Sequence, residues 1–459
     1  MSSYVPLFII VGTLICMTGL LWRPRSTFEL LRPIYVVPAL IWGVTFFQAI
    51  QYEFVPESWS TIYSDAREKS ASWALIYTTG CVLAFFLGFL LPVGKRLARP
   101  LARIEFGFNI HPESVLHIGL TLGVILNLAI LGLVGPVVYG FGPAWGFFGI
   151  DSAMGAKIGP AVIVLVGVGA ACVGIGFPMK GQRGLHHWVE AIVALFLLSI
   201  PYMSAFSRGS GFPVLVAVVA RIVQTRRLRW IPLILALLWV GMAGHAGLAG
   251  RGLHGHYAGV WPYLKYLVTD SLFEWDLGGS EAETYGYDAL TPLCVTLTAV
   301  DKLPMGQLSL WEWIRLQIPI PRIPGIHPDW TFTLTYYVGG FGNWGYTSGM
   351  LGDTFGHFKW WGVIPFIILG VCYRVIDQLC FRDREKYISG IFSIYTILLF
   401  TSYYAMMVGL FNNFRTWTSA FFYPTYLVVG FNLLRHWFVP RHTYTDHELF
   451  HYFPNELQR

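Results

Sequence analysis

The sequence from 191 to 220, AIVALFLLSIPYMSAFSRGSGFPVLVAVVA, is a long apolar stretch that is interrupted by a single arginine, Arg208. A charge in or near hydrocarbon is costly, and such a residue usually faces a cavity or a ligand. The apolar residues on either side are numerous enough to form two helices that meet at a turn around Arg208. This stretch therefore predicts two membrane helices and a partner for Arg208, which the rest of the sequence must help to identify.

The whole chain has the composition of an integral membrane protein. Of its 459 residues 55% are hydrophobic and only 12% are charged, and the mean hydropathy is +0.56. Many apolar runs are about 17 to 22 residues long, which matches the hydrocarbon thickness of roughly 30 Å at 1.5 Å per helical residue. None of them alternates as the strands of a membrane barrel do. We therefore predict an all-α, polytopic transmembrane helical bundle.

Apolar length and helix breakers together predict about eleven spans. They are expected at residues 4–22, 34–50, 72–93, 115–135, 158–177, 187–206, 209–225, 230–249, 357–379, 388–410 and 417–438. The N-terminal membrane helices, about eight, then occupy 1–249, and an external segment occupies 250–356. The region 357–459 holds about three more membrane helices and a tail.

The loops between these spans alternate in charge. Basic residues gather in every second loop, at Arg23, Arg25 and Arg32; Lys95, Arg96, Arg99 and Arg103; Lys180 and Arg183; Arg226, Arg227 and Arg229; Arg382, Arg384 and Lys386; and Arg441. The positive-inside rule places these loops in the cytoplasm, the N-terminus outside and the C-terminus inside. The net charge of +6 comes from these clusters rather than from one basic stripe, so no nucleic-acid partner is expected.

The external segment 250–356 is rich in aromatic residues and carboxylates. We expect it to form short helices and loops that cap the outer mouth of the bundle. Aromatic faces and carboxylates suit sugar rings and hydroxyls, although an interfacial aromatic belt would look similar. The proline-rich stretch IPIPRIPG holds Arg322, and His327 follows it closely.

Some isolated polar residues have simpler interpretations. His117 and His245 lie in apolar stretches and are expected to be hydrogen-bonded packing residues rather than metal ligands. Glu190 and Arg374 lie near cytoplasmic helix ends, where they can extend to the interface. The cysteines lack the spacing of a metal site and are expected to pack as small apolar residues: Cys16, Cys81, Cys172, Cys294, Cys372 and Cys380. No metal or cofactor is expected.

Arg208, Arg251 and Arg415 come from separate parts of the chain but are all predicted at the outer face. Each could extend to the interface or pair with lipid headgroups. Alternatively they converge on an anion, because the guanidinium fork matches phosphate oxygens. Glycines in SRGSG and AGRGLHG leave room for a bulky ligand group.

Asp353 lies in GMLGDTFGHFKWWG, just before the span expected to begin near His357. Its carboxylate could be a helix N-cap that the helix dipole favours. It could instead be a general base at the depth of the arginines. Rival carboxylates in the external segment are Glu274, Asp276, Glu281 and Glu283.

Several motifs together resemble the O-antigen polymerase (Wzy) family, over roughly residues 200–430. They are SRGSGFPVLVAVV, AGRG, IPIPR, SGMLGDTFGHFKWWGVIPFIILG and NNFRTW. Members of that family polymerise oligosaccharide repeat units. The likeness implies a metal-independent, GT-C-like glycosyltransferase in the bacterial inner membrane, which joins undecaprenyl-diphosphate-linked repeat units at the outer face.

By the same resemblance, Arg208, Arg251 and Arg415 would bind the diphosphates and stabilise the leaving group. Asp353, with His327 next, would be the base that takes the proton of the acceptor hydroxyl.

Further candidate contacts to the substrate are Arg322, Tyr336 and Asn343 of the external segment. The expected partners are lipid-diphosphate-linked oligosaccharides, membrane lipids, a chain-length regulator and a flippase.

Three alternatives stay open. An O-antigen ligase would share the donor but use another acceptor. A flippase or transporter of the lipid-linked oligosaccharide would show repeats and broken helices with polar groups at the membrane midplane, whereas the polar residues here gather at the outer face. A structural partner in an export complex would tolerate substitution of single arginines.

Overall fold

The computed structural model describes residues 27–54, 64–102, 112–135, 153–177, 184–204, 208–225, 230–253, 260–269 and 349–382, together with single residues between 293 and 418. Within these residues every regular element is a helix. The all-α prediction is therefore confirmed for the described part of the chain.

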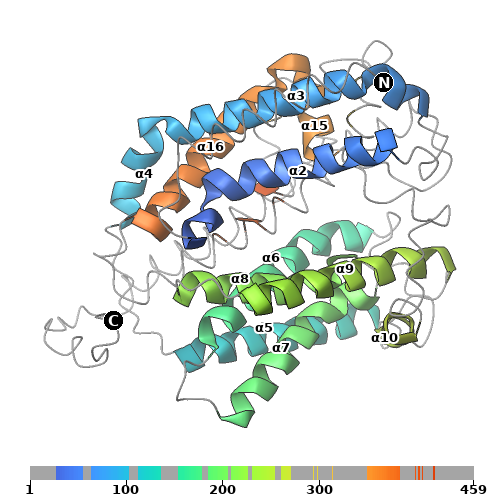
Figure 1. Cartoon of the computed structure of the whole chain (residues 1–459). Coiled ribbons are helices and arrows are strands. Elements are labelled where there is room, and N and C mark those ends of the chain that lie inside the picture. The colour runs from blue at the N-terminus through green and yellow to red at the C-terminus, as the bar shows by residue number, and fades with distance from the viewer. Residues whose placement is uncertain are drawn as a thin grey trace, which may run out of the picture.

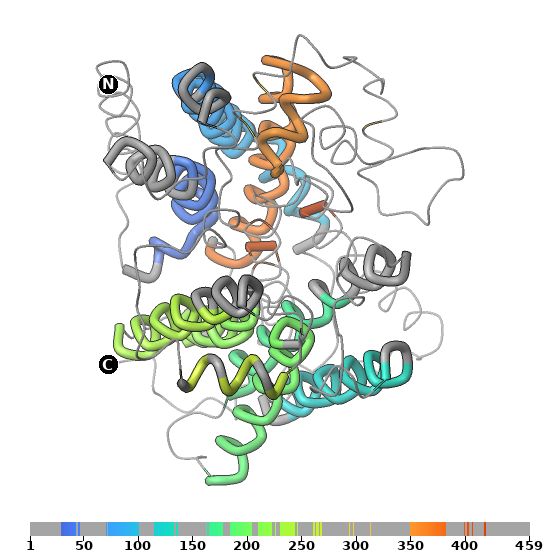
Figure 2. Tube along the Cα trace, turned by 90° about the vertical axis from the view of Figure 1, so that its right-hand side faces the viewer, coloured from blue at the N-terminus to red at the C-terminus, as the bar shows by residue number. Residues whose placement is uncertain are grey.

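The helices form two layers (Figures 1 and 2). The first layer contains η1 (Thr27–Leu31), α2 (Pro33–Phe54), α3 (Ser64–Leu90), α4 (Pro92–Ala102), α15 (Gly349–Phe358), η6 (Lys359–Val363), α16 (Ile364–Asp377) and η7 (Gln378–Arg382). The second contains α5 (Pro112–Val134), α6 (Ala153–Gly176), α7 (Leu185–Ser204), η5 (Arg208–Gly211), α8 (Phe212–Thr225), α9 (Trp230–Leu253) and α10 (Val260–Thr269). Contacts between η1 and α8 join the two layers.

In the described part, 4 helices are long and apolar enough to cross a membrane: Ser72–Leu90, Ser114–Gly132, Leu185–Met203 and Gly349–Phe381. Shorter apolar helices cover Pro33–Trp42, Leu165–Gly176, Phe212–Ile222 and Trp230–Ala243. These segments support a helical membrane protein. The expected span 4–22 lies outside the described residues, as do 388–410 and 417–438 apart from single positions.

The helices α3 and α16 approach closely at two glycines. A Cβ atom on Gly88 would lie 1.9 Å from the carbonyl oxygen of Ile367, and one on Gly370 would lie 2.2 Å from that of Phe85. Small residues permit such close backbone contact between membrane helices. Gly80 of α3 lies near Val363 of η6, and Gly94 of α4 lies near Arg374 of α16, so the two stretches of chain run in the same direction along the contact.

The second layer is held together by similar contacts. The Asn127 amide nitrogen on α5 donates a hydrogen bond to the Leu197 carbonyl on α7 at 2.8 Å. A Cβ atom on Gly174 of α6 would lie 2.1 Å from the Ala217 carbonyl oxygen of α8. The prediction that cysteines pack as apolar residues is confirmed where it can be followed, since Cys81 and Cys172 are buried in the core.

Residues of the expected C-terminal spans pack on α16 and η1. The Tyr373 hydroxyl donates to the Ser402 carbonyl at 2.9 Å, and the Trp417 indole nitrogen donates to the Tyr373 oxygen at 3.1 Å. The Tyr403 hydroxyl donates to the Leu31 carbonyl at 2.7 Å. Ser402, Tyr403 and Trp417 are thus part of the first layer.

A helical run begins with η6 at Lys359, close to the expected start near His357, but the chain before it is already helical. The helix α15 begins at Gly349 and ends at Phe358, and every residue from Gly349 to His357 is buried. Lys359 then adopts a φ of 53°, which breaks the helix before η6 and α16. The glycine-rich stretch Gly349–Phe358 is therefore a helix that other elements enclose.

Candidate functional site

Asp353 and His357 form a buried pair on α15. Asp353 Oδ1 lies 3.4 Å from His357 Nε2, and the two side chains are 9% and 6% exposed. The spacing of four residues places both on the same face of the helix. Ionisable groups buried inside a membrane bundle are costly and mark candidate functional positions.

The first half of α3 packs against the part of α15 that carries this pair. The Tyr77 hydroxyl is hydrogen-bonded to Thr354 Oγ1 at 3.0 Å, and the rings of Tyr77 and Phe355 meet edge to face at 5.0 Å. The chain after α15 folds back onto it, since a Cβ atom on Gly362 would lie 2.4 Å from the Thr354 carbonyl oxygen. These contacts fix α15, and with it Asp353, against α3.

The interpretation of Asp353 as a helix N-cap was wrong, because it lies inside α15 and not at its start. Its interpretation as a general base stays a prediction. Trp313, an earlier residue of the external segment, also reaches this region: its ring packs edge to face on Phe358 at 5.1 Å.

The backbone of the expected arginine site lies in the second layer. Arg208 begins η5, the turn between α7 and α8, and Arg251 lies near the end of α9. The turn η5 packs closely on α9, since a Cβ atom on Gly211 would lie 2.8 Å from Val240 Cα. The two arginines are therefore carried by elements in direct contact.

One tyrosine of α10, Tyr263, links η5 to α9 by hydrogen bonds. The Tyr263 hydroxyl donates to the Ala243 carbonyl of α9 at 2.9 Å and is hydrogen-bonded to Ser210 Oγ of η5 at 2.6 Å. Ser210 and Tyr263 are both fully buried. The position of the turn that begins with Arg208 is thus set by α9 and α10 together.

The other predicted site residues lie outside the described residues: His327, Arg322, Tyr336, Asn343 and Arg415. The side chains of Arg208 and Arg251 also lie outside the described residues, as do the rival carboxylates of the external segment. Asp353 lies in the first layer and both described arginine positions lie in the second. Convergence of these groups on one ligand stays a prediction.

A second buried polar cluster lies at the opposite end of α16. Arg32 donates from Nε to Asp377 Oδ1 at 2.7 Å and from Nη2 to Oδ2 at 2.8 Å. Arg374 Nη1 donates to Asp377 Oδ2 at 3.0 Å, and its guanidinium lies 4.9 Å from the centre of the Phe89 ring. The expectation that Arg374 extends to the interface was wrong, because this side chain is buried in a salt bridge.

The pKa of the Arg32 guanidinium is raised above its ordinary value. Burial opposes the charged form, but the hydrogen bond and the charge of Asp377 outweigh that cost. Arg32 therefore keeps its charge throughout the range in which the protein would work.

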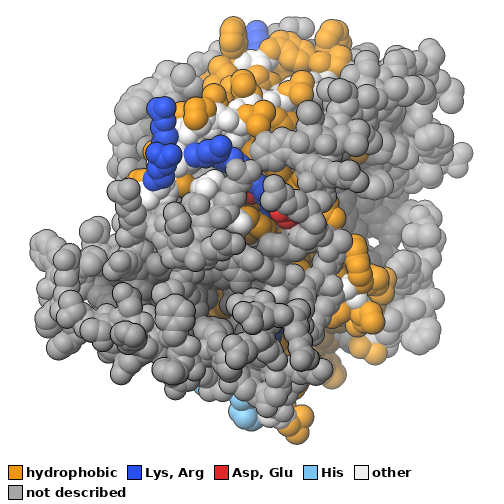
Figure 3. Space-filling view, turned by 60° about the vertical axis from the view of Figure 1, so that its left-hand side comes forward, with side chains coloured by type: hydrophobic (Ala, Val, Ile, Leu, Met, Phe, Trp, Pro, Cys, Tyr) orange, Lys and Arg blue, Asp and Glu red, His pale blue; other side chains and the backbone are white. Residues whose placement is uncertain are grey.

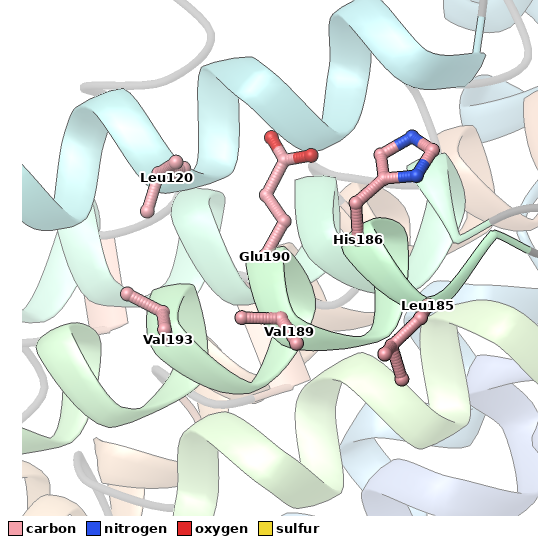
Figure 4. A pocket seen from close by; sticks show the side chains of 6 residues that line it. All are labelled: Leu120, Leu185, His186, Val189, Glu190 and Val193. Carbon is pink, nitrogen blue, oxygen red and sulfur yellow. The ribbon is translucent and has the colours of Figure 1, made fainter.

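His117 of α5 pairs with Glu190 of α7, so its expected hydrogen bond is present, but the expected packing role was wrong because the His117 side chain is 65% exposed. Glu190 does not need to extend to the interface, since it has this partner. Figure 4 shows Glu190 pointing toward the helix that carries Leu120. An open groove here is lined by Leu120, Leu185, His186, Val189, Glu190 and Val193. The side chain of His245 lies outside the described residues.

Among the described residues, no group of three or more His, Cys, Asp or Glu side chains could hold a metal ion. No family model matches the chain, and no curated protein or solved structure matches it either. The functional interpretation therefore depends on the sequence and on the geometry of these clusters.

Sequence reasoning missed His357, Tyr77 and Thr354 as neighbours of Asp353. The spacing of Asp353 and His357 was a usable signal, but only once the segment was known to be helical. Nothing local in the sequence points to Tyr77, which lies 277 residues before its partner Thr354.

Proposed function

We propose that the chain is a polymerase of lipid-linked oligosaccharides in a bacterial inner membrane. It would join undecaprenyl-diphosphate-linked repeat units at the outer face as a metal-independent glycosyltransferase. The full protein would have about eleven spans, with the segment 250–356 as a cap over the outer mouth. The observation that carries the proposal is the buried Asp353–His357 pair, at the end of the first layer remote from the basic cluster of Arg32.

The reaction needs a base and a stabilised leaving group. An acceptor hydroxyl of the incoming repeat unit attacks the anomeric carbon of the growing chain, and Asp353 takes the proton of that hydroxyl. The bond between the anomeric carbon and the diphosphate oxygen breaks, and the lipid diphosphate leaves with the electron pair. His357, at 3.4 Å, would hold the carboxylate in position.

Arg208, Arg251 and Arg415 would bind the diphosphate. The leaving group gains negative charge in the transition state, where fixed guanidinium groups stabilise it most. Contact between η5 and α9 supports a shared role for Arg208 and Arg251, because it brings the two elements that carry them together. The turn is also held by Tyr263, so its position is defined before a ligand binds.

One observation favours a second candidate, a flippase for the same lipid-linked oligosaccharide. The apolar stretch Gly349–Phe381 is interrupted at Lys359, where φ is 53°. Broken helices of this kind form substrate sites in transporters. The ligase alternative shares the donor chemistry of the polymerase and differs in its acceptor.

The test is a reconstituted reaction. Purified protein in liposomes receives the native lipid-diphosphate-linked repeat unit, and the products are separated by length on a gel. Wild type should give a ladder, and Asp353→Asn and Arg208→Ala should each lower its yield by roughly 100-fold or more. Glu29→Gln is the matched control, because it makes the same carboxylate-to-amide change at the other end of the first layer.

The other outcomes separate the alternatives. Movement of the substrate across the liposome membrane without a ladder would support the flippase. Transfer of one finished chain to a lipid-core or protein acceptor would support the ligase. A full ladder from both folded variants would refute the proposed roles of Asp353 and Arg208.

A further inference from the structure

The helix α4 follows directly after the span Ser72–Leu90 and runs at a steep angle to α3 (Figure 1). Pro92 begins it, at a helical position where a missing backbone N–H is tolerated. One face of α4 is fixed to the bundle: Ala98 is 1% exposed, and a Cβ atom on Gly94 would lie 2.7 Å from Arg374 Cγ. The other described side chains of the helix, from Pro92 to Pro100, are exposed.

The open surface of α4 divides into a basic and an apolar face. Lys95, Arg96 and Arg99 are exposed and fall on one side by helical periodicity. Val93 and Leu97 are 45% and 50% exposed and fall on the other side. Figure 3 shows Lys and Arg side chains gathered beside exposed hydrophobic ones on one part of the surface. This division is typical of a helix that lies in a membrane interface.

The membrane helix before α4 also has an exposed apolar side. That side of α3 consists of Trp73, Ile76, Leu83, Leu87 and Leu90, each of which is at least 39% exposed. Because this span is the length of a bilayer crossing, lipid covers its exposed side. Val93 and Leu97 follow this span directly in the chain, so the same lipid would reach them, and the basic face of α4 would lie at the level of the phosphates.

We propose that α4 is an interfacial helix that binds the phosphate headgroups of anionic phospholipids. Val93 and Leu97 lie against the acyl chains, while Lys95, Arg96 and Arg99 contact the headgroups. The positive charge of the basic face selects anionic over zwitterionic lipid, since each Lys or Arg near such a surface strengthens the association roughly fivefold. This inference does not depend on the proposed polymerase activity.

The experiment uses the purified full-length protein in detergent with equal amounts of phosphatidylglycerol and phosphatidylcholine. After washing, the retained lipids are quantified by mass spectrometry for wild type and for Lys95→Gln/Arg96→Gln/Arg99→Gln. Wild type should retain phosphatidylglycerol in excess, and the variant should lower the ratio of the two lipids by about fivefold or more. The variant should fold, because the three side chains are exposed; if it does not, the three single variants replace it.

The matched control is Arg226→Gln/Arg227→Gln/Arg229→Gln, which removes the same number of charges from another loop expected on the same side. This control should keep the lipid ratio of wild type. An equal fall in both triple variants would show a general charge effect and overturn the proposal. It would also be overturned if wild type retained the two lipids equally or if the α4 variant kept the preference.

Discussion

Arg32 and Asp377 are 345 residues apart in the sequence and form a two-point buried ion pair, with donor–acceptor distances of 2.7 and 2.8 Å. Arg374 contacts the same carboxylate at 3.0 Å. The pair joins the residue before α2 to the last turn of α16. It therefore fixes the first layer at the end where its basic residues lie.

Removing the shared carboxylate should destabilise the protein strongly. In Asp377→Ala two guanidinium groups stay buried without it, and breaking a buried pair costs about 3–5 kcal/mol. The free energy of unfolding in mixed micelles measures this loss. The triple variant Arg32→Met/Asp377→Leu/Arg374→Met should be closer to wild type than Asp377→Ala is. A loss below about 1 kcal/mol in Asp377→Ala would contradict a buried pair.

The contribution of Arg32 should be constant from neutral to moderately alkaline pH. Its pKa is raised in the folded protein, so its stabilisation is fully present below the unfolded pKa and is lost only as pH rises through the folded pKa. The difference in melting temperature between wild type and Arg32→Gln should therefore be the same at pH 7 and at about pH 10. A difference that already shrinks at about pH 9 would show that the interaction is not carried by Arg32.

Gly88→Ala should be destabilising because the added methyl group would meet a backbone oxygen at 1.9 Å. Overpacking of this kind costs about 1–3 kcal/mol. Gly132→Ala is the control, since nothing lies within 4 Å of its Cβ position and alanine is the better helix former. Thermal unfolding of the two variants measures the difference. Equal stabilities would mean that α3 and α16 are not in close contact.

Tyr263→Phe should lower polymerase activity by roughly tenfold or more, because a small displacement of a binding group has a large effect on rate. The variant loses the hydrogen bonds that hold η5 against α9, at a stability cost of only about 1 kcal/mol. Ser199→Ala removes a hydrogen bond within α7 and should leave activity unchanged. Product yield and donor KM are the measurements. If Tyr263→Phe kept the product yield and donor KM of wild type, the position of η5 would not matter for donor binding.

Substitutions of His357 distinguish a positioning role from packing. His357→Gln keeps a polar group near Asp353 and should retain more activity than His357→Phe, which keeps only the volume. Because Asp353 takes the proton in the proposed reaction, the loss should appear in kcat and not in donor KM. Greater activity in His357→Phe would show that His357 acts by packing alone.

The sequence by itself determined that this protein is built from apolar helices. Span length and hydrophobicity are local properties, so the starts of α5 and α7 follow closely from the residues themselves. Span length and hydrophobicity were less informative about α15, because the burial of a segment depends on the elements that surround it. The sequence showed a carboxylate at Asp353 but not that it would be enclosed in a helix beside His357.

Only the tertiary structure decided which polar groups meet. Arg374 looked like a residue that extends to the interface, yet it is buried because Asp377 and the Phe89 ring compensate its charge. The contact of Gly88 with Ile367 and that of Tyr77 with Thr354 depend on how helices distant in sequence pack. Hydrophobic pattern identifies the helices that are long and apolar enough to cross a membrane, whereas shape and pairing between helices select their neighbours.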